Sequence, residues 1–199
     1  MPEAKDTVCA GVRGLWGLFP RLVELAGLME KGVLRPDPAL SDETRRRLTK
    51  VRRSAEGICR QLTGSAAEDP SFFRYVSLPG HMERICDHFE NLSGLLRMKA
   101  VGDIHFSDKA ADEMHCMFRR LGELLSVLAG DASAAGGSGV KETWILMRKS
   151  AGEFAAIHDE RLREGICLPK AHAVYLGMLE EIKAIAWHLK KMARDLPAA

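Results

Sequence analysis

The sequence predicts an all-α protein of six long helices, arranged as two tandem, pseudo-repeated three-helix bundles. Three observations lead to this prediction. Apolar residues recur every three or four positions through most of the chain, and no segment alternates apolar and polar residues long enough to predict a strand. The links between periodic segments are short, as in antiparallel bundles. Residues of the first half also recur in the second half at a nearly constant shift.

Two periodic segments open the chain. The first spans about 6–30, and Gly32 and the proline-rich run after it are expected to end the helix. The second spans about 41–63 and begins at Ser41, whose hydroxyl is the expected N-cap. Its apolar residues keep strict three-four spacing, which is typical of helices packed against a partner. These residues are Leu48, Val51, Ala55, Ile58 and Leu62.

A third helix is expected to begin at Asp69-Pro70 and to run to about residue 99. Pro79-Gly80 lies inside it and should kink or split it, because proline lacks the backbone donor that a helix interior needs. The fourth helix begins at Ser107. Small residues then fill 130–139, which predicts a flexible connector rather than a phosphate-binding loop, because no Lys-Ser or Lys-Thr pair ends it.

The last two helices are expected over about 140–164 and about 169–195, separated by Gly165 and Pro169. The two halves of the sequence resemble each other at a nearly constant shift of about 100 residues. We expect a single domain with repeat one over about 6–103 and repeat two over about 104–199. At a shift of 99 residues Leu22 and Leu25 match Leu121 and Leu124, and at a shift of 100 residues Tyr75, Ile85 and His88 match Tyr175, Ile185 and His188.

Composition places the chain among soluble globular proteins, with 46% hydrophobic and 28% charged residues. A net charge of +2 gives no overall field that would favour nucleic acid or a membrane. No run is apolar enough to cross a bilayer, and the N-terminus does not resemble a signal peptide. The five cysteines are scattered without a C-x-x-C pair, which indicates reduced thiols. We therefore expect a cytoplasmic protein.

The segment 81–92 carries a line of polar side chains beside its apolar seam. Glu83 and Asp87 are four residues apart, so both carboxylates lie on one helix face, and Asn91 continues the line one turn further. Such a strip is explained either by a solvated helix flank or by a bound cation.

Two motifs resemble one known family. The run ERICDHFENL resembles the E-R-I-G-D-H-x-x-N signature of the PhoU family of phosphate-uptake regulators. The run HDERLREGICLPKAHAVYLGMLEEI, from His158 to Ile182, resembles the H-x-E-R-L-x-x-G-x-C-x-P-E-A run of PhoU-like domains, best known at the cytosolic end of bacterial sodium/phosphate cotransporters. The resemblance covers the chain in helix order. It implies two three-helix bundles side by side, and a regulator or adaptor rather than an enzyme.

The resemblance also implies a metal site, because several family members bind iron or zinc clusters on E-x-x-x-D or D-x-x-x-D pairs. At the matching positions of this sequence, the resemblance implies a divalent, iron or zinc ion bound by Glu83 and Asp87, with Asn91 as a further ligand. Glu56 is the acidic candidate from the second helix, and the arginines around it leave open an ion-paired strip without metal. The equivalent positions of the second half hold Lys183 and Trp187, so no second site is expected.

Basic residues crowd the segment 44–53. They indicate either a docking face for an acidic partner, an anion or the lipid headgroups beside a transporter, or a solvated helix flank. No helix-turn-helix pattern or interleaved aromatic residue accompanies them, so nucleic acid is not an expected partner. The residues are Arg45, Arg46, Arg47, Lys50, Arg52 and Arg53.

The expected function is therefore regulation of phosphate transport or phosphate signalling by docking on a phosphate transporter or its signalling partner. The soluble tail of a sodium/phosphate cotransporter fits the same motifs, with the chain held beside the membrane through the transporter. No hydrolase, zinc-protease or E-x-x-H motif indicates an enzyme. A metal-binding helical bundle, and a structural adaptor unrelated to phosphate, stay open as alternatives. A homodimer also stays open.

Overall fold

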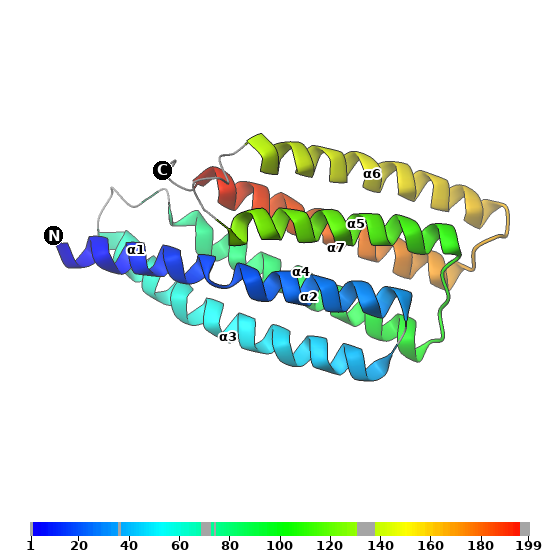
Figure 1. Ribbon diagram of the computed structural model, residues 1–199, viewed down its shortest axis with the longest axis horizontal. Coiled ribbons are helices and arrows are strands. Elements are labelled where there is room, and N and C mark those ends of the chain that lie inside the picture. Colours follow the sequence, from blue (N-terminus) through cyan, green and yellow to red (C-terminus); the bar gives the residue numbers. More distant parts are fainter. Residues whose placement is uncertain (1, 36, 69–72, 74, 131–137, 196–199) are drawn as a thin grey trace.

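The protein is described by a computed structural model, which covers residues 2–35, 37–68, 73, 75–130 and 138–195 (Figure 1). Within these ranges the chain forms seven α-helices and no strand, so the prediction of an all-α protein is confirmed. None of these helices is both long and apolar enough to span a bilayer. The helices are α1 (Pro2–Trp16), α2 (Phe19–Leu34), α3 (Pro38–Glu68), α4 (Ser77–Val101), α5 (Asp108–Ala129), α6 (Ser138–Arg163) and α7 (Pro169–Asp195).

The first helix expected from the sequence is divided in two, so the prediction of one continuous helix over 6–30 is wrong. Helix α1 ends at Trp16, and α2 begins at Phe19 after a two-residue turn. Pro20 lies in the first turn of α2. It has no N–H to donate to the Trp16 carbonyl, so the helical hydrogen-bond ladder cannot continue through this point. The backbone N–H of Leu18 instead donates to the Leu15 carbonyl at 3.1 Å.

The N-cap expected at Ser41 is also wrong. Helix α3 begins three residues earlier at Pro38, and Ser41 lies inside it with 9% of its surface exposed. The Asp37 carboxylate accepts a hydrogen bond from the backbone N–H of Ala39 at 2.8 Å. Proline at the first helical position has no donor that needs a partner. An acidic cap followed by proline therefore starts the helix before Ser41 is reached.

The kink or split expected at Pro79-Gly80 is not found. Helix α4 begins at Ser77, so both residues lie in its first turn rather than in its interior. Proline is tolerated there for the same reason as at Pro38. Asp69-Pro70, the expected start of this helix, lies outside the described residues. So do 131–137, most of the connector expected at 130–139, while Ser138 and Gly139 already belong to α6.

The start expected at Ser107 is confirmed, since its Oγ accepts a hydrogen bond from the Ala110 N–H at 3.3 Å. The end of α6 before Gly165 is confirmed as well. Gly165 has a φ of +72°, and the next residue, Ile166, donates its N–H to the Arg161 carbonyl at 2.9 Å. This left-handed residue closes the helix and reverses the chain toward α7.

Replacing Gly165 with alanine should lower the free energy of unfolding by about 1 kcal/mol, because a Cβ is strained at this left-handed φ. Gly152→Ala is the matched control. Gly152 lies in the exposed middle of α6 with open space around its Cα, so alanine there should stabilise the protein by up to about 1 kcal/mol. Urea denaturation measures both changes. Equal effects of the same sign would contradict the assigned role of Gly165.

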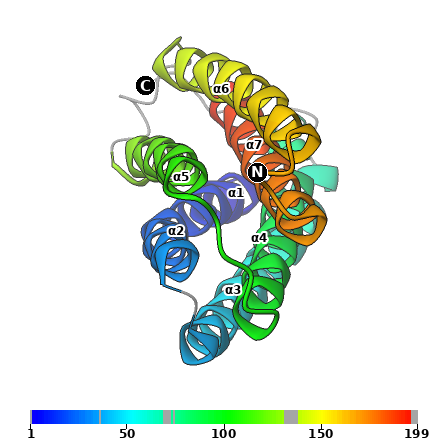
Figure 2. The ribbon, with the colours of Figure 1, turned by 90° about the vertical axis from the view of Figure 1, so that its right-hand side faces the viewer.

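The helices lie roughly along the long axis of an elongated molecule (Figures 1 and 2). Helix α3 packs on α1, α2 and α4, while α7 packs on α5 and α6. Two further contacts join these groups, α4 with α7 and α2 with α5. Ser77 contacts Asp195 and Asn91 contacts Glu181, so α4 and α7 run antiparallel.

Helices α4 and α7 carry a large part of the apolar core. Their core side chains are fully buried, and each such burial contributes about 1.5–3 kcal/mol. The start of α1 and the end of α7 lie at one end of the molecule, and the α4–α5 and α6–α7 connections lie at the other (Figure 1). The buried residues are Met82, Ile85, Phe89 and Leu92 on α4, and Met178, Ile182, Ile185 and Leu189 on α7.

Candidate functional site

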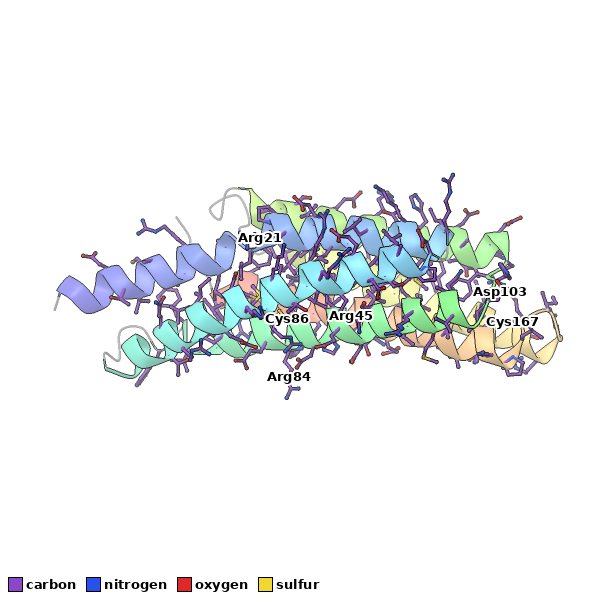
Figure 3. All side chains as sticks on the ribbon, turned by 90° about the horizontal axis from the view of Figure 1, so that it is seen from below. Arg21, Arg45, Arg84, Cys86, Asp103 and Cys167 are labelled. Carbon is purple, nitrogen blue, oxygen red and sulfur yellow. The ribbon has the colours of Figure 1, made fainter. Side chains whose placement is uncertain are left out.

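The acidic strip of α4 faces an arginine from α3. Arg52 Nη2 lies 2.8 Å from Asp87 Oδ1 and 2.8 Å from Glu90 Oε2. Arg84 approaches the second Asp87 oxygen at 3.7 Å and otherwise points away from the helices, as Figure 3 shows. Asn91 donates its amide to Glu181 Oε1 at 3.2 Å. The ion-paired alternative foreseen for this strip is therefore the arrangement found at Asp87.

The remaining two predicted metal ligands lie apart from these pairs. Glu83 is exposed and Glu56 is half-buried. Both carboxylates lie near Cys59, whose pKa rises to about 11, chiefly through burial and further through these two negative charges. Within the described ranges, no group of three or more His, Cys, Asp or Glu side chains is placed to hold a metal ion. A cation bound by Asp87 and Asn91 would have to displace Arg52 and Glu181, so the residues as they lie do not fit a metal cluster.

Replacing Arg52 with alanine should lower the free energy of unfolding by about 1 kcal/mol, because its side chain is only 29% exposed and its guanidinium pairs with two carboxylates. Arg84→Ala, which removes a 69% exposed side chain from the same strip, should change it by less than about 0.5 kcal/mol. Urea denaturation compares the two. A neutral Arg52→Ala, together with stoichiometric iron or zinc that Glu83→Ala/Asp87→Ala abolishes, would instead assign the strip to a metal.

The basic segment of α3 is partly neutralised by neighbouring acids. Arg45 pairs with Asp42, and Arg46 and Arg47 pair with Glu43. Arg47 also reaches Glu24 on α2 at 3.2 Å. The remaining two cations, Lys50 and Arg53, form no ion pair with a residue that the structure describes.

A buried polar cluster lies where α5, α6 and α7 meet. We call it the polar cluster, and its members are Glu113, His158, Arg161, Cys167, His172 and Tyr175. At its centre the Arg161 guanidinium donates to both Glu113 oxygens, at 2.5 and 3.1 Å. The Tyr175 hydroxyl donates to the same carboxylate at 2.7 Å. These three residues are at most 8% exposed, so the pair is desolvated and fixed by three hydrogen bonds.

His158 lies beside this ion pair and is 2% exposed. Its ring stacks on Tyr175 at a centroid distance of 4.0 Å and on His172 at 5.3 Å. Its Nε2 lies 3.2 Å from Cys167 Sγ. Its other ring nitrogen, Nδ1, lies 3.4 Å from Arg161 Nη1, so both nitrogens of this buried histidine have a polar neighbour.

The turn after α6 brings Cys167 to His158. The Arg161 carbonyl accepts hydrogen bonds from the N–H groups of Ile166 and Cys167, at 2.9 and 3.1 Å. Pro169 then begins α7, which carries His172 and Tyr175 back along the same face. The motif from His158 to Tyr175 therefore folds into one local unit around its own arginine.

Burial controls the electrostatics of the polar cluster. It lowers the pKa of His158, and the positive charge of Arg161 lowers it further, so the imidazole is neutral at pH 7. Burial and then Glu113 raise the pKa of Tyr175, and burial raises the pKa of Cys167. A thiol with a raised pKa is a poor nucleophile. The arrangement suits a rigid binding or structural unit.

The polar cluster borders a small cavity at the end of the molecule that holds the α4–α5 and α6–α7 connections. The cavity measures about 190 Å³, and His158, Arg161 and Cys167 line it together with Phe106 and Ser107. Figure 3 shows Cys167 and Asp103 at this end. The cavity falls below the size range of about 300–1,000 Å³ that is usual for small-molecule sites.

Histidines form the polar contact between α4 and α7. His81 Nδ1 and His188 Nδ1 lie 3.0 Å apart, and His88 Nδ1 lies 2.7 Å from Glu181 Oε2. Trp187 packs edge-on against the His188 ring at 4.7 Å. His88 and His188, which match at the 100-residue shift, therefore both have polar partners in this contact.

Sequence reasoning missed the ion pair at the centre of the polar cluster. Glu113 and Arg161 are 48 residues apart, and neither stands in a recognisable ligand spacing. A signal was present: Glu113 stands between Ala110 and Met117 on the apolar face of α5, where an acid needs a buried partner.

Comparison of this chain with protein-family models, curated proteins and solved structures found no match.

Proposed function

We propose that this chain is a PhoU-like regulator or adaptor of phosphate transport or phosphate signalling, acting in the cytoplasm by docking rather than by catalysis. One observation carries the proposal. Three of the residues that give the second half its resemblance to PhoU-like domains, His158, Arg161 and Cys167, converge in the polar cluster, where Arg161 holds Glu113 of α5.

The helix pairing supports the finer architecture that we propose, two pseudo-repeated three-helix bundles. One unit comprises α1/α2, α3 and α4, and the other comprises α5, α6 and α7. Two of the three pairs of corresponding helices pack together, α4 with α7 and α2 with α5. His88 and His188, which match at the 100-residue shift, have ring centroids only 5.4 Å apart. Corresponding residues meet in this way when they lie near an approximate two-fold axis between repeats.

The α3 arginines supply the proposed docking face. Arg45 and Arg46 have side chains 59% and 72% exposed, and their carboxylate partners lie on the same helix. Exposed ion pairs of this kind contribute about 0–1 kcal/mol to stability. The carboxylates of an acidic partner can therefore replace those of α3 as the arginines' ion-pair partners at little cost. Lys50 and Arg53 add charge to this helix. The partner that fits is an acidic cytosolic surface of a phosphate transporter, to which the chain is joined or docks, or of its signalling protein.

The proposal is tested by deleting the gene and measuring radiolabelled phosphate uptake at limiting and at high phosphate. We expect deletion to change the dependence of uptake on phosphate supply and wild-type protein to restore it. Arg45→Glu/Arg46→Glu/Arg53→Glu should fold, as judged by circular dichroism, but fail to restore it. The charge-matched control Lys31→Glu/Lys109→Glu/Lys149→Glu should restore it, because these exposed lysines lie outside the proposed face.

Two results would contradict the proposal. Uptake and phosphate response that are unchanged by deletion would favour a structural adaptor outside phosphate biology. Full restoration by the α3 charge-reversal variant would keep the phosphate role but remove α3 as the docking face.

A further inference from the structure

The face between α6 and α7 carries two adjoining hollows near the start of α6 and the end of α7. The first measures about 440 Å³ and is lined by Trp144, Arg148, Lys183, Ala184, Trp187 and His188. The second, which we call the cationic hollow, measures about 370 Å³, and the described residues that line it are Lys141, Lys190, Lys191 and Arg194. Lys190 Nζ lies 3.7 Å from the centroid of the Trp144 ring, so the aromatic hollow and the cationic hollow meet. Each hollow falls in the size range usual for small-molecule sites.

The charges of these hollows are largely uncompensated, unlike those of α3. Lys141, Arg148, Lys190 and Lys191 form no ion pair with any residue in the described ranges. Lys183 and Arg194 pair with Glu180 and Asp195. Burial lowers the pKa of Lys190, and the nearby positive charges of Lys191, Arg194, Lys141 and Arg148 lower it further. A bound polyanion would reduce the electrostatic repulsion between cations that lie this close together.

The aromatic hollow adds a second requirement on the ligand. Trp187 is 37% exposed and lies beside Lys191, whose Nζ is 5.0 Å from its ring centroid. Arg148 lies over Trp144 at 5.1 Å. A planar ring, such as a nucleic-acid base, can stack on an exposed indole, and cations beside the indole add to the attraction. Phosphate ions alone would leave this half of the groove unused.

We propose that the α6–α7 groove binds a nucleoside di- or triphosphate, with the base against Trp187 in the aromatic hollow and the phosphates among Lys141, Lys190, Lys191 and Arg194. A ligand with one planar part and one polyanionic part matches the two adjoining hollows. The site is a binding site only, and no bond of the nucleotide is broken in it.

Titration with ATP, followed by tryptophan fluorescence, tests this site. We expect quenching of Trp144 and Trp187 that saturates below about 1 mM ATP. Lys190→Glu/Lys191→Glu should weaken binding at least about tenfold, since two attractive charges become repulsive. Trp187→Ala, followed by calorimetry, should weaken it about tenfold through lost stacking. The control Lys31→Glu/Lys109→Glu makes the same change in net charge on α2 and α5 and should bind ATP like the wild type.

Three results would overturn the proposal. The first is no saturable response to ATP. The second is equal affinity for ATP and inorganic tripolyphosphate, which would leave a plain anion site without base recognition. The third is binding to vesicles with anionic phospholipid in the absence of ATP binding, which would make the groove a membrane contact. Should Lys190→Glu/Lys191→Glu fail to fold, Lys141→Ala/Lys191→Ala removes two charges from the same hollow without placing carboxylates in the groove and should also weaken ATP binding.

Discussion

Replacing Arg161 with alanine should lower the free energy of unfolding by about 3–5 kcal/mol, a large share of the total stability of a domain. The substitution leaves the Glu113 carboxylate buried without its cation, with only the Tyr175 hydroxyl as a hydrogen-bond donor among the contacts described above. The cost comes from this uncompensated charge rather than from the attraction that is lost. Urea denaturation followed by circular dichroism measures it.

Two comparisons make the Arg161 experiment specific. Arg163→Ala removes an exposed arginine two residues away that pairs with Glu160, and it should cost less than about 1 kcal/mol. Glu113→Leu/Arg161→Met removes both charges and should be less destabilised than Arg161→Ala alone. A single substitution at Arg161 that proves as mild as Arg163→Ala would show that the ion pair does not organise the α5–α6–α7 junction.

Acid should destabilise the protein through His188. Burial lowers the pKa of this imidazole to about 4, and His81, His88 and Arg84 lower it in the same direction. The folded state therefore binds fewer protons than the unfolded state between the ordinary histidine pKa of about 6.5 and pH 4. Stability is then full above about pH 6.5 and falls as the pH decreases toward 4, by up to about 3 kcal/mol for this one group.

The pH dependence of the free energy of unfolding, measured in urea at several values between pH 7 and pH 4.5, tests the role of His188. His188→Gln should flatten the curve, because glutamine does not titrate. His105→Gln is the control, since His105 lies in the connection before α5 with a side chain 74% exposed, and the slope should stay unchanged. His81, whose pKa burial also lowers, will keep part of the slope in the variant. An identical slope in His188→Gln would contradict the assignment.

The helices could be predicted from the sequence wherever local chemistry decides the structure. The three-four spacing predicted α3 to α7 as separate helices, and Ser107 and Gly165 marked boundaries because each satisfies its own backbone requirement. The errors arose where two local signals competed. Asp37 with Pro38 starts α3 before Ser41, and Pro20 breaks a helix whose apolar spacing continues through it.

The side-chain partners could be predicted only in part. Arginine was foreseen as an alternative to a cation beside Asp87, and Arg52 lies there. The Glu113–Arg161 pair and the α6–α7 groove depend on which faces of distant helices meet. Helical spacing indicates which residues are buried, but it does not indicate the neighbouring helix.

The antiparallel contact of α4 with α7 has a consequence for synthesis of the chain on the ribosome. Helix α4 is finished by about residue 101, and α3, which packs on one side of it, is already synthesised, yet the helix that covers its other side begins only at Pro169. At about 5–20 residues per second, the nascent chain carries this second side of α4 uncovered for several seconds before α7 emerges. During that interval the α7-facing side of α4 is accessible to chaperones and to other nascent chains.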